Sequence, residues 1–219
     1  MNPMPRLRLE EIWPPFALRV ETEDLVLTAV READIPELVD LVLDGIHDPT
    51  HMPFLFPWTD APEDELPANY VRYVGRVLAT QSAQSLSLQL VVRQAGHLVG
   101  IQALEGEDFH LTRSLETGSW LARRFHGQGI GTRMRQAVCA LAFDHLGAHR
   151  ITSSAFLDNP SSLAVSRKVG YRSNGRQWVV RRGAAAEQER LLLSPETFVR
   201  GAPIHVAGAP QLKAFLGVT

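Results

Sequence analysis

The stretch His126-Gly127-Gln128-Gly129-Ile130-Gly131-Thr132 places three glycines at alternate positions, between an apolar run and a helical pattern. Glycine allows successive backbone N–H groups to point at one spot, and the first turn of a helix adds partial positive charge there. The stretch is therefore typical of a turn that binds phosphate groups. A flexible loop is the alternative, because turns accumulate glycine for steric reasons.

Two common phosphate-binding motifs do not fit this spacing. A P-loop requires a Lys-Ser or Lys-Thr pair, and the chain contains neither. A dinucleotide-binding fingerprint counted from Gly127 requires glycine where the chain has Thr132. The turn must therefore belong to another class of phosphate site.

The segments after the turn carry clear helix and strand signals. Apolar residues recur at helical spacing over 130–146, and Gly147 follows as a typical helix stop. A strand is predicted over 150–156. A second helix is predicted to begin after Asn159 as N-cap, with proline at its first position, and to end before Gly170.

Two motifs in this region carry a family resemblance. The turn fits [Q/R]-x-x-G-x-[G/A] except that His126 stands at the first position, and the second helix carries N-x-x-S-x-x-V-x-x-K-x-G-Y from Asn159 to Tyr171. Together they resemble the GCN5-related N-acyltransferase (GNAT) superfamily, and the second block is similar to the branch that acylates ribosomal protein N-termini. The resemblance covers residues 24–194.

The resemblance implies a single-domain α/β fold with a mixed sheet, mostly antiparallel with a splayed parallel pair, flanked by helices. The length of 219 residues suits one domain, and the mixture of strand and helix patterns favours the same class. We expect an N-terminal lead-in over 1–23, the acyl-CoA-dependent N-acyltransferase domain over 24–194 and a C-terminal extension over 195–219.

Local patterns predict the remaining elements. Strands are predicted over residues 25–30, 86–92, 97–104, 117–121, 177–182 and 190–193. Helices are predicted over 35–46 and 70–78, with an irregular loop rich in proline and aromatic residues over 47–67. At the end of the chain a short helix is a candidate over 195–200, and the remainder is either an arm or an edge element.

The resemblance implies an acyl-CoA donor, acetyl-CoA or succinyl-CoA. Its pyrophosphate would lie on main-chain N–H groups of the turn. The residues expected to bind the acyl-CoA donor as a whole are Leu121, Ala122, Arg124, His126, Gly127, Gln128, Gly129, Ile130, Gly131, Thr132, Asn159 and Ser162. Arginines also gather around the turn in the sequence, where phosphates would lie, although a solvated helix face is the alternative. They are Arg123, Arg124, Arg133, Arg135 and Arg150.

Direct transfer of the acyl group is expected. The chain has no G-x-S-x-G elbow, and its single cysteine, Cys139, lies in mid-helix among core positions, where a buried and inert thiol is predicted. As in the resembling family, an amine would attack the thioester of acyl-CoA directly. This requires a neutral amine, a stabilised thioester oxygen and a proton for the departing thiolate.

Four groups are candidates for this chemistry. Glu116 is the candidate base, with an edge-strand surface residue as the alternative. By resemblance Ser162 is the candidate acid or thiol anchor, although serine is favoured in any first helical turn, where Ser161 would serve equally. Tyr171 is the competing acid, or a core residue. A main-chain N–H within 120–122 is expected to stabilise the thioester oxygen.

The acceptor is expected to be a primary amine bound by Phe54, Trp58 and Trp120, with a hydrophobic plug over the core as the alternative for the loop residues. A protein or peptide α-amino group is favoured because it titrates near about 7.7–8.0, well below a lysine. A small-molecule amine such as a polyamine or aminoglycoside, and a non-catalytic acyl-CoA-binding module, are the alternatives. Similar blocks at 45–49 and 52–54 in succinyl-CoA-using relatives leave the acyl group open.

Charge and composition limit the partners. A net charge of −2 gives no general attraction to nucleic acid or membrane. Histidine pairs four residues apart lie across breaks in the helix pattern, so no metal site is expected. A single cysteine, no signal peptide and no membrane-length apolar run predict a cytoplasmic protein. Homodimers are common in the resembling branch, so one is a candidate here.

Overall fold

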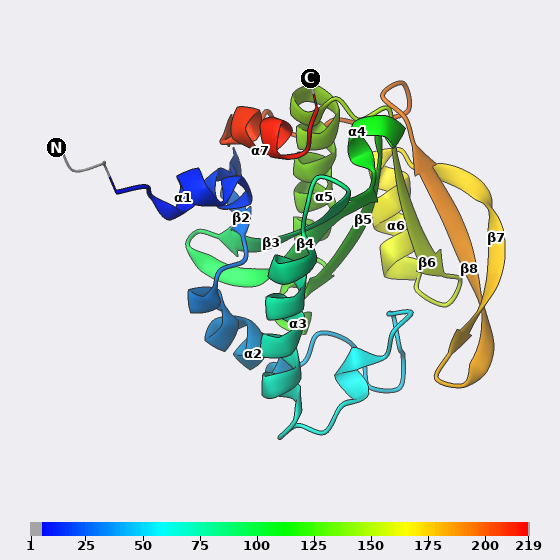
Figure 1. Cartoon of the computed structure of the whole chain (residues 1–219). Coiled ribbons are helices and arrows are strands. Elements are labelled where there is room, and N and C mark those ends of the chain that lie inside the picture. The colour runs from blue at the N-terminus through cyan, green and yellow to red at the C-terminus, as the bar shows by residue number, and fades with distance from the viewer. Residues whose placement is uncertain (1–5, 219) are drawn as a thin grey trace, which may run out of the picture.

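The computed structural model describes residues 6–218, and in them nine strands form one sheet in the order β7-β8-β6-β5-β4-β3-β2-β1-β9 (Figure 1). The strands are β1 (Arg19–Thr22), β2 (Leu25–Ala29), β3 (Ser85–Gln94), β4 (His97–Glu107), β5 (Ser114–Leu121), β6 (Arg150–Phe156), β7 (Arg172–Arg181), β8 (Ala184–Leu193) and β9 (His205–Ala207). Neighbours pair antiparallel except β5 and β6, which are parallel. The predicted fold class is confirmed.

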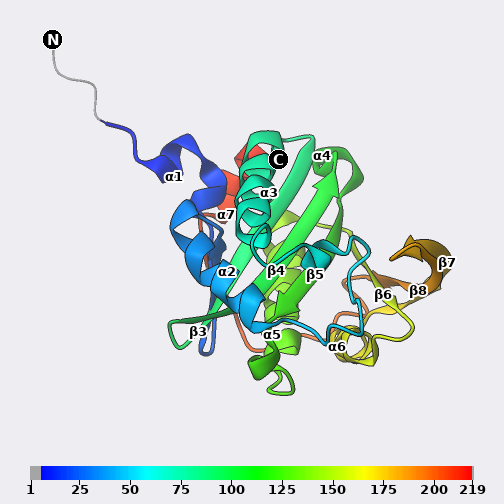
Figure 2. The same ribbon diagram turned by 90° about the horizontal axis from the view of Figure 1, so that it is seen from below.

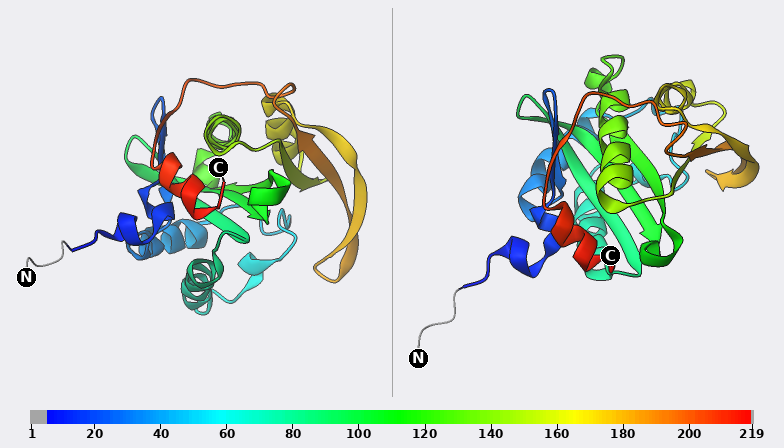
Figure 3. Two further views of the ribbon diagram at one scale, coloured as in Figure 1. Left: turned by 45° about the horizontal axis from the view of Figure 1, so that its top comes forward. Right: turned by 90° about the horizontal axis from the view of Figure 1, so that it is seen from above.

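Helices cover both faces of the sheet. They are α1 (Leu9–Ile12), α2 (Ile35–Asp44), α3 (Leu66–Thr80), α4 (Phe109–Thr112), α5 (Ile130–Ala140), α6 (Pro160–Val169) and α7 (Ala209–Phe215). Helices α2 and α3 lie on one side of the central strands (Figure 2), and α5 lies on the other (Figure 3). Each side has its own buried apolar cluster, so the sheet separates two cores.

The helices form where apolar spacing and caps agree. In α2 the buried residues are Leu38, Val39, Leu41 and Val42. The helix stops at Asp44, short of the predicted end, because Gly45 has a φ of 103°. Helix α5 continues from Leu141 to Leu146 as a π-helical segment before Gly147 ends it. In α6, Asn159 Oδ1 accepts the Ser162 N–H at 3.1 Å, as the predicted N-cap does.

The two ends of the described chain meet at one edge of the sheet. Strand β9 pairs antiparallel with β1, and the segment before it crosses α5 (Figure 3). The short helix considered at 195–200 is absent, because the chain there makes only a turn and then runs extended, with Val199 O accepting from Gln136 Nε2 at 3.0 Å. An edge strand and α7 follow instead.

Strands β5 and β6 diverge after a short parallel ladder. Their pairing covers only residues 114–116 and 150–152. Ser153 Oγ donates to Thr117 O at 3.0 Å at the point where the strands separate. Beyond this vertex β5 pairs with β4 alone and β6 with β8 alone. The expected splay is therefore present, and it opens toward the glycine-rich turn.

Candidate active site

The glycine-rich turn lies between the end of β5 and the start of α5, at the open end of the splay. Gly127 and Gly129 have φ values of 77° and 78°, which only glycine adopts without strain. Within residues 6–218 the five N–H groups of 127–131 have no acceptor. The Thr132 N–H, in contrast, donates to Gly129 O at 3.1 Å. Five successive free N–H groups at a helix N-terminus form an anion site.

Side chains of the turn brace it rather than face a ligand. A ring nitrogen of His126 lies 3.0 Å from Leu121 O, and Gln128 Nε2 donates to Arg124 O at 2.9 Å. Arg124 itself pairs with Asp44. The residues predicted around the phosphates are thus gathered here, but the main chain presents the anion site.

The expected ring of arginines around the phosphates is wrong in part. Arg150 Nε donates to Ser114 Oγ at 3.1 Å, at the opposite end of β5 from the turn. Arg135 is buried against the strands. Arg133 pairs with acidic residues of the β1–β2 hairpin. Arginines close to the turn in sequence do not all face the phosphate site, because successive residues of a helix point in different directions.

Strand register decides which main-chain groups face the splay. Ala122 N–H donates to Val99 O at 3.0 Å, so Ala122 and, two residues earlier, Trp120 direct their N–H groups toward β4. Ser119 and Leu121 alternate with them and direct their N–H groups toward β6, which has already diverged. Within 120–122 the free donor is therefore the N–H of Leu121.

Glu116 lies on the α3 face of β5, directly opposite Glu105 of β4. Loss of hydration first, and the charge of Glu105 second, raise the pKa of Glu116 above the usual value for a glutamate. Glu105 is fixed by hydrogen bonds from Ser87 Oγ at 2.9 Å and Gln89 Nε2 at 3.0 Å. A carboxylate with a raised pKa is suited to accept a proton near neutral pH.

The structure brings the predicted acceptor residues together on the same face. The ring centroids of Phe54 and Trp58 are 5.4 Å apart, and Trp58 lies 6.4 Å from Trp120 and 6.1 Å from Tyr70. Phe54, Trp58 and Trp120 are half-buried and pack on the α2–α3 core. They therefore cover the core and also present aromatic surface beside β5.

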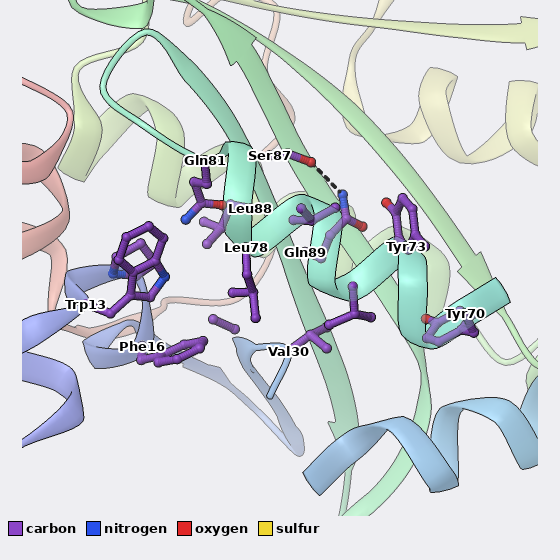
Figure 4. Close-up of a pocket in the computed structure, with 14 residues that line it drawn as sticks. Trp13, Phe16, Val30, Tyr70, Tyr73, Leu78, Gln81, Ser87, Leu88 and Gln89 are labelled. Atoms are coloured by element: carbon purple, nitrogen blue, oxygen red, sulfur yellow. Dashed lines mark hydrogen bonds between the residues drawn. The ribbon is translucent and has the colours of Figure 1, made fainter. Parts of the chain in front are cut away.

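A cleft further along this face lies between α3 and the N-terminal segment (Figure 4). Trp13 and Phe16 line one side, and Tyr73 lies on α3 near Gln89. Burial first, and then the charge of Glu105, raise the pKa of Tyr73 to about 12. The cleft thus adjoins the polar groups that fix Glu105 but lies apart from the turn.

The β7–β8 hairpin curves away from the sheet, and its tip holds the aromatic loop (Figures 1 and 3). Arg182 donates to both carboxylate oxygens of Asp60, at 2.7 and 2.5 Å, and Arg181 donates to Met52 O at 3.0 Å. Arg181 also binds Asp158 with two hydrogen bonds, which lower the pKa of that carboxyl. We call this set of contacts, made by Arg181 and Arg182 with Asp158, Asp60 and Met52, the rim. Sequence reasoning missed the rim because its partners are far apart along the chain.

Tyr171, Cys139 and Ser162 belong to the opposite side of the sheet. Tyr171 Oη lies 2.7 Å from Thr117 Oγ1 and 3.7 Å from Cys139 Sγ. Burial raises the pKa of Cys139 to about 12 and that of Tyr171 well above its usual value, so both stay protonated. Ser162 is half-buried in the first turn of α6.

Metal-ligand clusters and membrane-spanning helices are both absent from the described part of the chain. No three His, Cys, Asp or Glu side chains within residues 6–218 are grouped so as to hold a metal ion. No helix in that range has the length and apolar character needed to cross a membrane.

Comparison with known proteins gives consistent matches. The family model described as an acetyltransferase (GNAT) domain matches residues 24–172. The "Putative ribosomal N-acetyltransferase YdaF" of Bacillus subtilis (strain 168) is 32% identical over 81 residues, which is 37% of this chain and 44% of that protein. The chain thus matches less than half the length of this curated relative.

Solved structures share the fold. RimJ of Mycobacterium smegmatis, in complex with CoA-disulfide, superposes with a TM-score of 0.67 at 19% identity, covering 92% of this chain and 95% of that one. Spermidine N-acetyltransferase of Vibrio cholerae, in complex with CoA and spermine, gives 0.59 at 17% identity, covering 80% and 97%.

Proposed function

The chain belongs to the acetyltransferase (GNAT) family, and from this premise we propose that it transfers an acyl group from acyl-CoA to the α-amino group of a protein or peptide. The observation that carries the proposal is the row of free N–H groups at 127–131, placed at the open end of the β5–β6 splay. An anion site and an open strand pair, end to end, suit a ligand with a pyrophosphate and a long polar arm.

The donor side is assigned to main-chain groups. The N–H groups of 127–131 hold the pyrophosphate, and those of Ser119 and Leu121 face the arm in the splay. Asn159 Oδ1 is already used by the helix cap, so only its amide N–H groups remain for the donor. Acyl-CoA supplies the activated thioester.

The chemistry is divided between the two sides of the splay. The amine nitrogen forms a bond to the thioester carbonyl carbon, and the carbon–sulfur bond breaks. Glu116 takes the proton that the amine loses, directly or through water, and the Leu121 N–H stabilises the carbonyl oxygen as it gains charge. The Ser162 hydroxyl donates a hydrogen bond to the departing thiolate, and the proton that it passes to the sulfur is replaced from solvent.

The acceptor side suits an amine that arrives as a cation and loses its proton in the site. The α3 face carries the Glu105–Glu116 pair beside the aromatic surface of Phe54, Trp58 and Trp120. An α-amino group needs only a modest base, which Glu116 provides. The same carboxylate pair makes a small polyamine the second candidate acceptor, because two carboxylates favour a multiply charged amine.

Mass spectrometry of an acceptor panel tests the proposal. The protein is incubated with acetyl-CoA or succinyl-CoA and with an N-terminal peptide, its N-terminally blocked counterpart or spermidine. We expect acylation of the free peptide and none of the blocked one. Acylation of spermidine alone would establish the second candidate. Calorimetric CoA binding without transfer to any amine would instead identify a non-catalytic binding module.

Ser162→Ala tests the leaving-group role, with Ser161→Ala as the matched control in the same helical turn. We expect Ser162→Ala to lower kcat in a way that depends on the leaving thiol and is rescued little by raised pH. Equal behaviour of the two variants would contradict the assignment.

The location and the oligomeric state are part of the same proposal. A protein α-amino group or a polyamine as acceptor favours a cytoplasmic enzyme. Sedimentation of the purified protein tests whether it is a homodimer.

A further inference from the structure

Arg135 is a buried cation without an anionic partner. It lies in the second turn of α5 and is 4% exposed. Its Nη2 donates to Ser119 Oγ at 2.8 Å, its Nη1 lies 3.5 Å from Ser153 Oγ at the limit of a hydrogen bond, and its Nε has no partner. A guanidinium has five N–H donors, so most of them are unused. Within residues 6–218 no carboxylate pairs with it.

Burial of such a group is costly unless an anion compensates it. Arginine stays charged in proteins, and an unpaired buried charge costs several kcal/mol. The titratable neighbours do not compensate it, because burial holds the thiol of Cys139 and the phenol of Tyr171 in their neutral forms by raising the pKa of each. The guanidinium therefore lacks a countercharge in the protein itself.

The position of Arg135 relates it to the donor site. Its two serine contacts come from β5 and β6 just beyond the vertex of the splay, so the guanidinium spans the two strands where they separate. A donor with its phosphates on the turn directs its acyl end toward this vertex. Leu121 and Ser119 are two residues apart along β5, about 6.7 Å, which an acetyl group does not bridge.

We infer that Arg135 binds the terminal carboxylate of a dicarboxylic acyl group, such as a succinyl group, and that the chain selects such acyl-CoA donors. The inference rests on the proposed function and names the donor class of the same site. A four-carbon dicarboxylic chain extends from the Leu121 N–H toward Ser119. Charge favours this direction, because the other face of the sheet carries Glu116 of β5 and Glu105 of β4, which repel a carboxylate.

A purely internal pairing does not account for the group. Gln102, opposite Ser119 in the ladder, is also fully buried, and its Oε1 has no partner. A rotation that joined Arg135 Nε to this oxygen would still leave other guanidinium donors unused and the charge uncompensated. An acyl carboxylate satisfies both the donors and the charge.

Calorimetry of succinyl-CoA, acetyl-CoA and CoA tests the inference without relying on turnover. We expect wild type to bind succinyl-CoA more tightly than acetyl-CoA. Arg135→Met should reduce the succinyl-to-acetyl affinity ratio by about 10–100-fold, the equivalent of a charged hydrogen-bonded pair. Arg135→Lys should recover part of the ratio. Arg133→Met, two residues earlier on the same helix, should leave the ratio unchanged.

Melting temperatures without ligand separate binding from bracing. Arg135→Met should melt no lower than wild type, because methionine removes an uncompensated buried charge. A lower melting temperature with equal loss for all three ligands would make Arg135 a brace between the strands and overturn the inference. So would a wild type that does not discriminate between the acyl groups.

Failure of the proposed function has a different signature. A folded wild type that binds none of the three CoA compounds would remove the donor site altogether. Tight CoA binding and acetyl transfer, with an unchanged succinyl-to-acetyl affinity ratio in Arg135→Met, would support the proposed function. The same result would contradict the assignment of Arg135 to a carboxylate.

Discussion

The two faces of β5 have opposite chemistry although their residues alternate along one strand. Toward α5, Thr117 and Ser119 join the buried polar groups around Arg135. Toward α3, Glu116 and Trp120 form an acidic and aromatic surface. One strand thus separates a side suited to an anionic donor from a side suited to a cationic acceptor. The period of two in a β-strand places these two sets of side chains on opposite faces of the sheet.

The largest effect is expected from removing the candidate base on the acceptor face. Glu116→Gln should lower kcat by about 10²–10⁴ near neutral pH, the usual contribution of a general base. The loss should shrink at higher pH, where the amine deprotonates unaided. Rate measurements from pH 6 to 9 with the identified acceptor check this, and wild-type kcat/KM throughout would make Glu116 a surface residue only.

The pH dependence of the activity tests the role of Glu116 on the acceptor face independently. Because the pKa of Glu116 is raised in the folded protein, activity should fall as pH decreases through that pKa and the base becomes protonated. Glu105→Gln removes one cause of the shift, so this acid limb should move to lower pH. The ionised form is the one that folding disfavours, so Glu116→Gln should not lower the melting temperature at pH 7.

The next effect concerns the donor side alone. Gly131→Val should weaken CoA binding by about tenfold or more, the scale of one lost hydrogen bond to a charged group. Its backbone tolerates a Cβ, which would meet Val165 and Leu121 only at ordinary contact distances of 3.6 and 3.7 Å. Gly75→Val on α3, where nothing lies within 4 Å, is the matched control. Equal calorimetric affinities for both variants would remove the phosphate site.

The aromatic surface should show a mixed effect. Because Phe54 and Trp58 are half-buried, truncating both to Ala should raise the acceptor KM several-fold and also cost stability, less than the about 3–5 kcal/mol of a fully buried aromatic. CoA affinity should stay the same. Kinetics and denaturant unfolding measure the two parts, and a large stability loss with normal kinetics would assign the loop to the core alone.

The smallest effect is expected from a substitution in the rim. Arg182→Ala breaks the pairing with Asp60 and should change stability little, because the pair is exposed and screened by solvent. It should nevertheless raise the acceptor KM by loosening the aromatic loop. Arg200→Ala, which breaks another exposed pair, with Asp144 on the other side of the sheet, is the control. Identical KM values in both variants would separate the rim from the acceptor.

The sequence predicted features that depend on local patterns. Helix α6 was predicted because its cap at Asn159 and stop at Gly170 are local, and β6 because its apolar spacing covers the whole strand. The turn at 127–131 was found because glycine spacing is visible in the chain. The family resemblance added the splay, which no single segment encodes.

Other features depend on tertiary contacts that no local signal reveals. The β7–β8 hairpin is longer than predicted because much of it is exposed and so lacks apolar alternation. Strand β9 has only three residues and is held in the sheet by its pairing with β1, which lies far away in the sequence. The burial of Arg135 was missed because arginine is expected at the surface, and only the path of α5 across the strands places it inside.

The pairing of β1 with β9 has a consequence for how the chain acquires its fold. Residues 19–21 pair with residues 205–207, so this edge is completed only after nearly all of the sheet-forming sequence exists. At about 5–20 residues per second, translation of the intervening chain takes roughly ten to forty seconds. During that time β1 presents an open edge to other nascent chains, and its unpaired backbone groups are covered only when β9 is added.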